Sequence, residues 1–476
     1  MQKKVRDMTL KRREFIRNLA TGLAATGAAA SKLACLTVAD SPSEALLVDR
    51  PGQPEPAPIG YDRLPLDWHQ ARTRELKKRV EERDVDAILL GQDQNMVYFS
   101  GCFRRSGERS TWLLFPIGET ETDTAYWYAP SIDRDLISSW WSTEMENYFC
   151  YPHAEGGFPY RGELARGNRV DLFEWMLQGL GKRGLGDKTI GIDFELSASR
   201  RQTAESVLPE ARFVEIGDLC LDMQIKKTPE EIALTQRAYR YFDKVHAFAR
   251  DYILERGTEA TDFEVGQALQ AYGLDLMLND VERDGRPNSA VGMEVTSHYV
   301  RAGVSTAFPH PNQFFYTRIQ KGQPLYVNTD IKLGGMGGEG YRNYLIEPVA
   351  PYQEKMWQVV MDCAEILREE IVPGKVCSEI AYKVHDYQIK NGMADYIYHR
   401  PSHGQGQFYS GHQPPFIALG DDSIVEPGMM FSVEPGLYDE ERGIGVNPSD
   451  ILLVLEDRSV FMTRVPFSKE WSFLTL

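Results

Sequence analysis

The chain has 476 residues, of which 26% are charged and 42% hydrophobic, a composition that excludes wholesale disorder and indicates a soluble globular protein of about two or three domains. Its 53 basic and 69 acidic side chains give a formal charge of −16, which argues against a nucleic-acid partner. No apolar run is long enough for a membrane span, and the absence of a Cys-x-x-Cys pair argues against structural zinc.

The amino terminus has the pattern of an export signal. A basic segment with Lys-Arg-Arg-Glu-Phe-Ile at 11–16 precedes an Ala- and Gly-rich apolar stretch that ends in three alanines. This pattern predicts a twin-arginine signal peptide over residues 1–30, and therefore a periplasmic or secreted protein. Spacing leaves the disulfide pairing open for the cysteines beyond this region, which are Cys102, Cys150, Cys220, Cys363 and Cys377.

Two domains are expected after a linker. Residues 31–64 are rich in proline and lack a periodic pattern, so we expect a linker there. Helix-like and strand-like segments then alternate over 65–222, which indicates an α/β domain. A second domain is expected over 223–476. Near its start, Thr228-Pro229-Glu230-Glu231 has the pattern of a capping box and predicts the beginning of a long helix.

Three histidines have contexts that suggest chemistry. His310 lies in Phe-Pro-His-Pro, and His403 lies in Ser-His-Gly-Gln-Gly with His412 nine residues later. Imidazole is the side chain best suited to proton transfer near neutral pH, so these three are candidate catalytic residues. Glu434 lies in the second of two Glu-Pro-Gly turns that flank a predicted strand.

The glycine-rich run at 334–340 invites a phosphate-loop interpretation. It lacks the Lys-Ser/Thr that follows such loops, and it lies between two strand-like runs rather than before a helix. We therefore expect a flexible hairpin connection there.

Four motifs occur in a recognisable order along the chain. They are Lys-Lys-Thr-Pro-Glu-Glu-Ile from 226, Phe-Pro-His-Pro from 308, Ser-His-Gly-Gln-Gly from 402, and the double Glu-Pro-Gly strand from 425 to 438. Together they resemble the creatinase/aminopeptidase P/prolidase superfamily over residues 65–476. The resemblance implies an α+β fold, with a carboxy-terminal pita-bread domain after a smaller α/β creatinase-type amino-terminal domain. It also implies a homodimer in which each amino-terminal domain covers the site of the other subunit.

The resemblance also bears on metal binding. Peptidase members of the superfamily bind two divalent ions through Asp, Asp, His, Glu and Glu. Three anionic ligands are missing from the aligned positions, so we expect no metal and no other cofactor. Asp330 lies on the same strand face as the first aligned position, so Asp330, His403 and Glu434 are a fallback site for one divalent ion. The aligned positions are Asn328, Tyr344, His403, Glu434 and Ser449.

Asparagine at the first ligand position resembles creatinase, the metal-independent hydrolase of the group. This predicts an exported hydrolase that cleaves a C–N bond of a small polar, zwitterionic compound without a metal. His310 would be the general base and acid, Glu434 would hold the positive charge of the substrate, and His403 and His412 would orient it. Further substrate contacts are expected from Asn328, Tyr344 and Glu347, and, across the dimer, from Arg104 or Arg105.

Two other functions stay open. A metal-dependent member would be a Xaa-Pro peptidase, or a lyase like the iron-dependent dimethylsulfoniopropionate lyases that share this fold. Its metal content would distinguish it from the first hypothesis. A non-catalytic binding protein would keep the pocket without the chemistry, but it would have no need for a base such as His310 beside a carboxylate such as Glu434.

Overall fold

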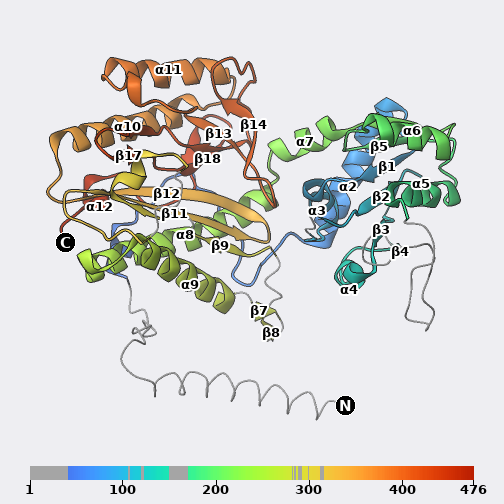
Figure 1. Cartoon of the computed structure of the whole chain (residues 1–476), viewed down its shortest axis with the longest axis horizontal. Helices are drawn as coiled ribbons and strands as arrows, with labels where there is room; N and C mark the ends of the chain where they lie inside the picture. The colour runs from blue at the N-terminus through green and yellow to red at the C-terminus, as the bar shows by residue number, and fades with distance from the viewer. Residues whose placement is uncertain are drawn as a thin grey trace, which may run out of the picture. The chain divides into compact units, whose positions relative to one another are not determined.

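The computed structural model describes residues 41–104, 108–118, 123–148, 170–280, 282–283, 286–287, 292–297, 300–310 and 316–476 (Figure 1). The predicted signal peptide, Arg105, Cys150 and His298 lie outside the described residues. Within the described part of the chain, no helix is both long and apolar enough to cross a membrane. The cysteines described there are buried free thiols, namely Cys102, Cys220, Cys363 and Cys377.

The amino-terminal part is built on a six-stranded sheet with the strand order β4-β3-β2-β1-β5-β6. Strand β1 is parallel to β5 and antiparallel to β2. All four residues of β1 are buried, and alternate ones enter two different cores, as expected for a strand covered on both faces. The strands are β1 (Ala87–Leu90), β2 (Trp112–Pro116), β3 (Tyr126–Pro130), β4 (Glu144–Tyr148), β5 (Thr189–Ile192) and β6 (Arg212–Glu215).

Helices surround this sheet. Helix α3 follows β1 directly, and α6 follows β5, in the alternation that the sequence predicts for an α/β domain. The helices are α2 (Leu66–Val80), α3 (Asp93–Ser100), α4 (Arg134–Ser138), α5 (Leu172–Lys182), α6 (Ala198–Val207) and α7 (Gly217–Ile225).

The long helix α8 (Pro229–Arg256) begins at the predicted capping box. The Thr228 backbone N–H donates to the Glu231 carboxylate at 2.7 Å, and the Glu231 N–H donates to the Thr228 hydroxyl at 3.3 Å. Two amides that the first turn cannot satisfy are thereby paired. Gly257, with φ of +55°, ends the helix.

The carboxy-terminal part contains two five-stranded sheets with helices on both sides, and the predicted α+β class is confirmed. In Figure 1, α10 and α11 lie on one side of the strands, while α8 and α9 lie on the other. The first sheet contains β9 (Glu294–Thr296), β10 (Arg301–Ala302), β11 (Pro324–Leu333), β12 (Met336–Ile346) and β20 (Phe473–Leu474). The second contains β13 (Ser402–Gln405), β14 (His412–Ile417), β15 (Met430–Val433), β18 (Asp450–Val454) and β19 (Ser459–Phe461), and the helices are α9 (Asp262–Asp280), α10 (Pro351–Glu370) and α11 (Cys377–Lys390).

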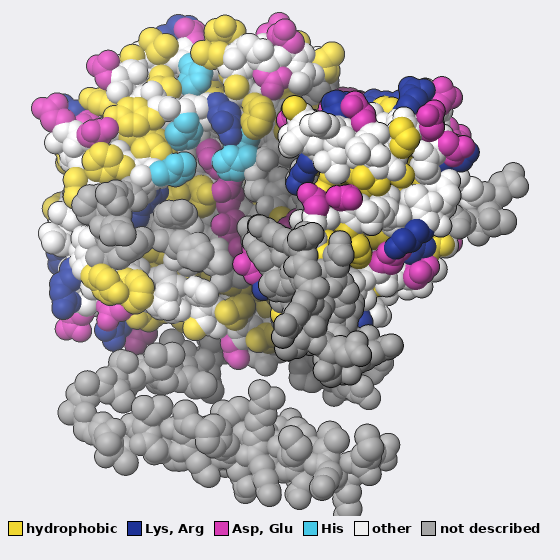
Figure 2. All heavy atoms as spheres, turned by 45° about the vertical axis from the view of Figure 1, so that its right-hand side comes forward, with side chains coloured by type: hydrophobic (Ala, Val, Ile, Leu, Met, Phe, Trp, Pro, Cys, Tyr) yellow, Lys and Arg dark blue, Asp and Glu magenta, His cyan; other side chains and the backbone are white. Residues whose placement is uncertain are grey.

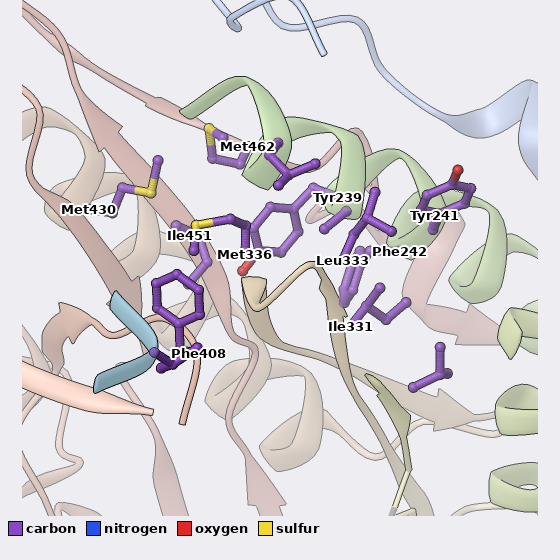
Figure 3. Close-up of a cluster of buried hydrophobic side chains, with 14 of the residues drawn as sticks. Tyr239, Tyr241, Phe242, Ile331, Leu333, Met336, Phe408, Met430, Ile451 and Met462 are labelled. Atoms are coloured by element: carbon purple, nitrogen blue, oxygen red, sulfur yellow. The ribbon is translucent and has the colours of Figure 1, made fainter. Parts of the chain in front are cut away.

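The hairpin of β11 and β12 packs directly on α8. Figure 3 shows Tyr239 and Phe242 from the helix against Ile331, Leu333 and Met336 of the hairpin. The approach is close enough that a Cβ added at position 340 would lie 2.1 Å from the Phe242 ring, which only glycine avoids. The turn itself consists of Gly334 and Gly335 alone, both with positive φ. The predicted connection is therefore shorter than expected, and residues 336–340 belong to β12.

A buried arginine joins the two sheets. Arg342 on β12 is 1% exposed, and its guanidinium donates to the backbone carbonyl of Ser449 at 2.7 Å and to the Asp450 carboxylate at 2.8 Å. It also donates to Thr463 Oγ1 at 2.9 Å. A buried charge with this many acceptors is compensated, and it fixes β12 against the start of β18.

His69 on α2 predicts a measurable pH dependence of stability. Its ring is 1% exposed, Nδ1 donates to the Tyr98 carbonyl at 2.8 Å, and burial lowers its pKa to about 4. The unfolded chain binds a proton near pH 6.5 and the folded chain does not, so acid favours unfolding. Wild type should therefore lose unfolding free energy when the pH falls from 7 to 5. His69→Asn keeps a hydrogen-bond donor but has no imidazole, so we expect its loss over this pH range to be smaller by about 2 kcal/mol, as measured by urea titrations.

The matched control is His385→Asn, because His385 lies partly exposed on α11. This variant should show the wild-type pH dependence. An equal loss of stability in wild type and His69→Asn would mean that the buried ring is not the source.

Candidate functional site

Two acidic side chains face each other on the β11–β12 hairpin. Asp330 and Glu339 are cross-strand partners in the antiparallel register. Their Cβ atoms therefore lie about 5 Å apart, on the same face of the sheet. The Tyr341 hydroxyl donates to Glu339 and orients its carboxylate.

The Glu339 carboxylate meets two histidines and a second glutamate. Glu339 Oε1 lies 3.2 Å from His403 Nε2 on β13, and Glu434 Oε1, just beyond β15, lies 3.3 Å from the same nitrogen. His412 at the start of β14 stacks on His403, with ring centroids 3.8 Å apart, and its Nε2 lies 3.9 Å from Glu339 Oε1. The Ser432 hydroxyl is within hydrogen-bond distance of both carboxylates. We call Glu339, His403, His412 and Glu434 the carboxylate–histidine cluster.

The electrostatics of the cluster indicate a surplus of negative charge. Burial, and then the Glu434 carboxylate, raise the pKa of Glu339 to about 7. Burial alone would raise the pKa of Glu434, but the hydrogen bond to His403 lowers it below its usual range. For His403, burial is outweighed by hydrogen bonds to the two glutamates, which raise its pKa to about 10. Two carboxylates this close need positive charge between them.

The residues fit one divalent ion. Ligand atoms of Glu339, His403 and His412 all lie within 4.8 Å of one another. Carboxylate oxygens with imidazole nitrogen are a donor set suited to manganese, zinc or iron. A cation would also balance the two glutamates in place of the protons. Figure 2 shows histidine side chains gathered beside acidic side chains on one face of the molecule.

The hairpin register shows which of the aligned positions face the cluster. Tyr344 lies five residues after Glu339 on β12, so its side chain is on the opposite face, where it is fully buried near Trp471. Asn328 is paired with Tyr341 rather than with an acidic residue. Asp330 and Glu339 occupy the facing positions instead, because the length of the hairpin decides which residues pair.

Ser449 is the remaining predicted ligand position, and there the carboxylate is indeed absent. Its hydroxyl lies 2.9 Å from the Ser432 hydroxyl, directly behind the two glutamates. Position 449 therefore places a neutral hydroxyl beside the cluster, where the resemblance implies a carboxylate in the peptidase members.

His310 lies exposed on a turn that is held in place by Arg301, a residue that the sequence interpretation did not single out. Arg301 Nη1 donates to the carbonyls of Phe308 and Pro309 at 2.5 and 3.0 Å, and the Arg301 guanidinium lies 4.0 Å from the Tyr326 ring centroid. The arginine is 2% exposed. It therefore anchors the turn that carries His310 to the wall of the first sheet.

His412 is the most exposed member of the cluster, with 52% of its side chain accessible. Its pKa falls to about 4, first through burial and then through the charges of His403, Arg400 and His310, with Glu434 opposing them. His412 is therefore neutral near pH 7. The Arg400 guanidinium lies beside the cluster, with Nη2 3.2 Å from His412 Nδ1.

Two predicted substrate contacts lie elsewhere. Arg104 is 4% exposed and engaged within the amino-terminal part, with Nε 2.7 Å from Asp133 and Nη1 3.6 Å from Asp93. Glu347 is exposed beyond the end of β12, about 26 Å along the strand from Glu339. The structure therefore does not bring Glu347 to the cluster. The contact expected from Arg104 is with the site of a second subunit and stays a prediction, and Arg105 lies outside the described residues.

Glu339 is the member of the carboxylate–histidine cluster that the sequence interpretation missed. A signal for it was present, since it is the one acid within the glycine-rich run. A two-residue turn at Gly334 and Gly335 places position 339 opposite Asp330. Assuming a tight turn rather than a flexible loop would have found the pair.

Comparisons with known proteins identify the family of the chain. Residues 233–456 match the model of metallopeptidase family M24, and residues 72–223 match the creatinase/prolidase N-terminal domain. A putative dipeptidase, YkvY, of Bacillus subtilis is 22% identical over 397 residues, which cover 83% of this chain and 98% of that protein. A Xaa-Pro dipeptidase of Pyrococcus furiosus is 21% identical, with 83% and 97% covered. The crystal structure of the prolidase from Pyrococcus horikoshii OT3 has a TM-score of 0.63 at 18% identity, with 83% and 98% covered.

These findings overturn the prediction of a metal-independent, creatinase-like hydrolase without a cofactor. That prediction rested on ligands counted at Asn328 and Tyr344, whereas the relatives are named as dipeptidases and the cluster around Glu339 fits a divalent ion. The broader expectation of a hydrolase family that acts on C–N bonds is confirmed. The chain belongs to the creatinase/aminopeptidase P/prolidase superfamily.

Proposed function

We propose that the protein is a metal-dependent peptidase that hydrolyses the C–N bond of short peptides, with Xaa-Pro dipeptides as the substrate class. The carboxylate–histidine cluster carries this proposal, because two glutamates held within 3.3 Å of one imidazole nitrogen are arranged for a cation. The names of the relatives support the substrate class.

Asp330, Glu339, His403 and Glu434 would hold the ion. When bound, such an ion polarises a carbonyl group and lowers the pKa of a water molecule. One of the two glutamates, which already share one imidazole, would accept a proton from the attacking water. His310, on the turn anchored by Arg301, delivers a proton to the leaving nitrogen.

The chain's export and assembly are also proposals. Residues 1–30 would direct the folded protein through the twin-arginine route to the periplasm or beyond, residues 31–64 would be a linker, and the two domains would meet near residue 223. The mature protein would act as a homodimer on a small-molecule substrate. A reporter fused to residues 1–30, with Arg12→Lys and Arg13→Lys as the control, tests export, and a mass measurement in solution tests the dimer.

The activity test uses a Xaa-Pro dipeptide. We expect hydrolysis that a chelator abolishes and Mn²⁺ or Zn²⁺ restores, and we expect His310→Ala to lower kcat by at least ~10² while substrate still binds. Free proline is the product to measure. Two results would contradict this function. One is turnover that survives exhaustive chelation, and the other is a lyase reaction in which a small substrate is cleaved by elimination without the addition of water.

The variant Glu339→Gln tests two effects of this carboxylate separately: its binding of the ion, and its destabilisation of the ion-free fold. We expect binding of Mn²⁺ to weaken by at least ~10². The ion-free variant should unfold at a higher temperature than ion-free wild type, because repulsion between the Glu339 and Glu434 carboxyl groups is removed. Calorimetric titration and thermal unfolding in chelator measure the two effects.

Glu347→Gln is the matched control, since it makes the same change at an exposed position beyond the same strand. It should leave Mn²⁺ affinity and melting temperature as in wild type. Wild-type affinity in Glu339→Gln would remove this residue from the site.

Variants at Ser449 and Tyr344 distinguish the proposed ligand set from the positions that the resemblance aligns with the family's ligands. Wild type should hold one ion per chain, and Ser449→Glu should hold a second, because position 449 adjoins the cluster through Ser432. Tyr344→Asp should add no ion and should destabilise the fold, since its side chain is buried on the opposite face near Trp471. Metal analysis of the purified proteins decides, and two tightly bound ions in wild type would contradict the single-ion site.

A further inference from the structure

Arg400 directs a hydrogen-bond donor at His412. Its Nη2 lies 3.2 Å from His412 Nδ1, and its guanidinium carbon lies 4.7 Å from the ring centroid of Phe416. Phe416 and His412 belong to the same strand, β14, so ring and imidazole hold the guanidinium along one edge of the sheet. Among the described residues, no carboxylate forms an ion pair with Arg400. Its orientation therefore depends on these two contacts.

This contact determines which nitrogen of His412 carries the proton. A guanidinium only donates, so Nδ1 of His412 must accept. A neutral imidazole that accepts at Nδ1 has its proton on Nε2. That Nε2 faces the cluster, 3.9 Å from Glu339 Oε1. His412 thus presents an N–H group, not a lone pair, to the site.

His403, which stacks on His412, carries its proton on the other ring nitrogen. Its Nδ1 lies 3.0 Å from the carbonyl oxygen of Gly404, which only accepts, so Nδ1 carries a proton. In the neutral ring, Nε2 then offers its lone pair to the space between Glu339 and Glu434. The two rings lie 3.8 Å apart but present different chemistry to the same space.

We propose that Arg400 is a positioning residue that fixes His412 in the Nε2–H tautomer, so that His412 presents a hydrogen-bond donor to the site and not a lone pair that could bind an ion. The proposal rests on the proposed function, since it concerns the same site. It also means that His412 is not a metal ligand, although its Nε2 lies within ligand distance of the group formed with Glu339 and His403. A ring that bound an ion through Nε2 would carry its proton on Nδ1, where it would meet the Arg400 donor.

The tautomers can be read directly. Two-bond ¹H–¹⁵N correlations of the full chain labelled with ¹⁵N-histidine distinguish the Nδ1–H and Nε2–H forms, and His412→Gln assigns the His412 signals by their loss. We expect Nε2–H for His412 in wild type and in Arg400→Lys, which keeps a donor. In Arg400→Leu, which keeps an apolar contact with Phe416, the Nδ1–H form should appear. An Nδ1–H form in wild type, or an unchanged Nε2–H form in Arg400→Leu, would overturn the proposal.

Metal affinity provides a second readout that does not depend on activity. Titration with Mn²⁺ should give His412→Gln an affinity close to that of wild type, whereas His403→Gln should bind at least ~10² more weakly. Equal losses in the two variants would make His412 a ligand and overturn the proposal. If wild type binds no Mn²⁺ or Zn²⁺, the proposed function fails, and the tautomer measurement still decides whether Arg400 controls His412.

Discussion

Glu339 and Glu434 approach the same nitrogen of His403, to 3.2 and 3.3 Å, and their negative charges must be balanced within a space from which water is largely excluded. In the absence of an ion, protons on Glu339 and His403 balance this charge, and the raised pKa values of both groups show that they hold these protons more tightly than usual. An ion with two positive charges at this point would replace those protons. The cluster is thus more favourable with a cation than without one, which connects the fold to the proposed chemistry.

The scaffold holds these groups together by contacts remote from the chemistry. The capping box at Thr228 starts α8, and α8 supports the β11–β12 hairpin through the close approach of Phe242 to Gly340. Arg342 then joins β12 to β18 through the Ser449 carbonyl and Asp450. Glu339 belongs to the first sheet, whereas His403 and Glu434 belong to the second. Repulsion between the carboxylates is tolerated because these buried contacts prevent the sheets from separating.

Much of this architecture can be predicted from the sequence, but the ligand set cannot be completed from it. The capping pattern at Thr228 locates a helix because its signal is local, and the motifs around His403 and Glu434 locate site residues because each is a short contiguous run. The partner of Asp330 depends on how many residues form the hairpin turn, and a change of one residue moves every side chain to the other face. The resemblance to the family therefore pointed to Tyr344, which lies near Trp471, and not to Glu339. The tautomers of His403 and His412 depend on contacts with Gly404 and Arg400 that no sequence pattern encodes.

Membership of the superfamily does not by itself decide how many ions this chain binds, because Ser449, which lies 2.9 Å from the Ser432 hydroxyl, stands at a position where the resemblance implies a carboxylate in the peptidase members. The proposed site would hold one ion between the hairpin and the second sheet. Anomalous scattering at the manganese edge from crystals of the mature protein grown with Mn²⁺ tests this most directly. The account predicts one peak bounded by Asp330, Glu339, His403 and Glu434. No peak at the cluster, or two peaks of equal height there, would contradict it.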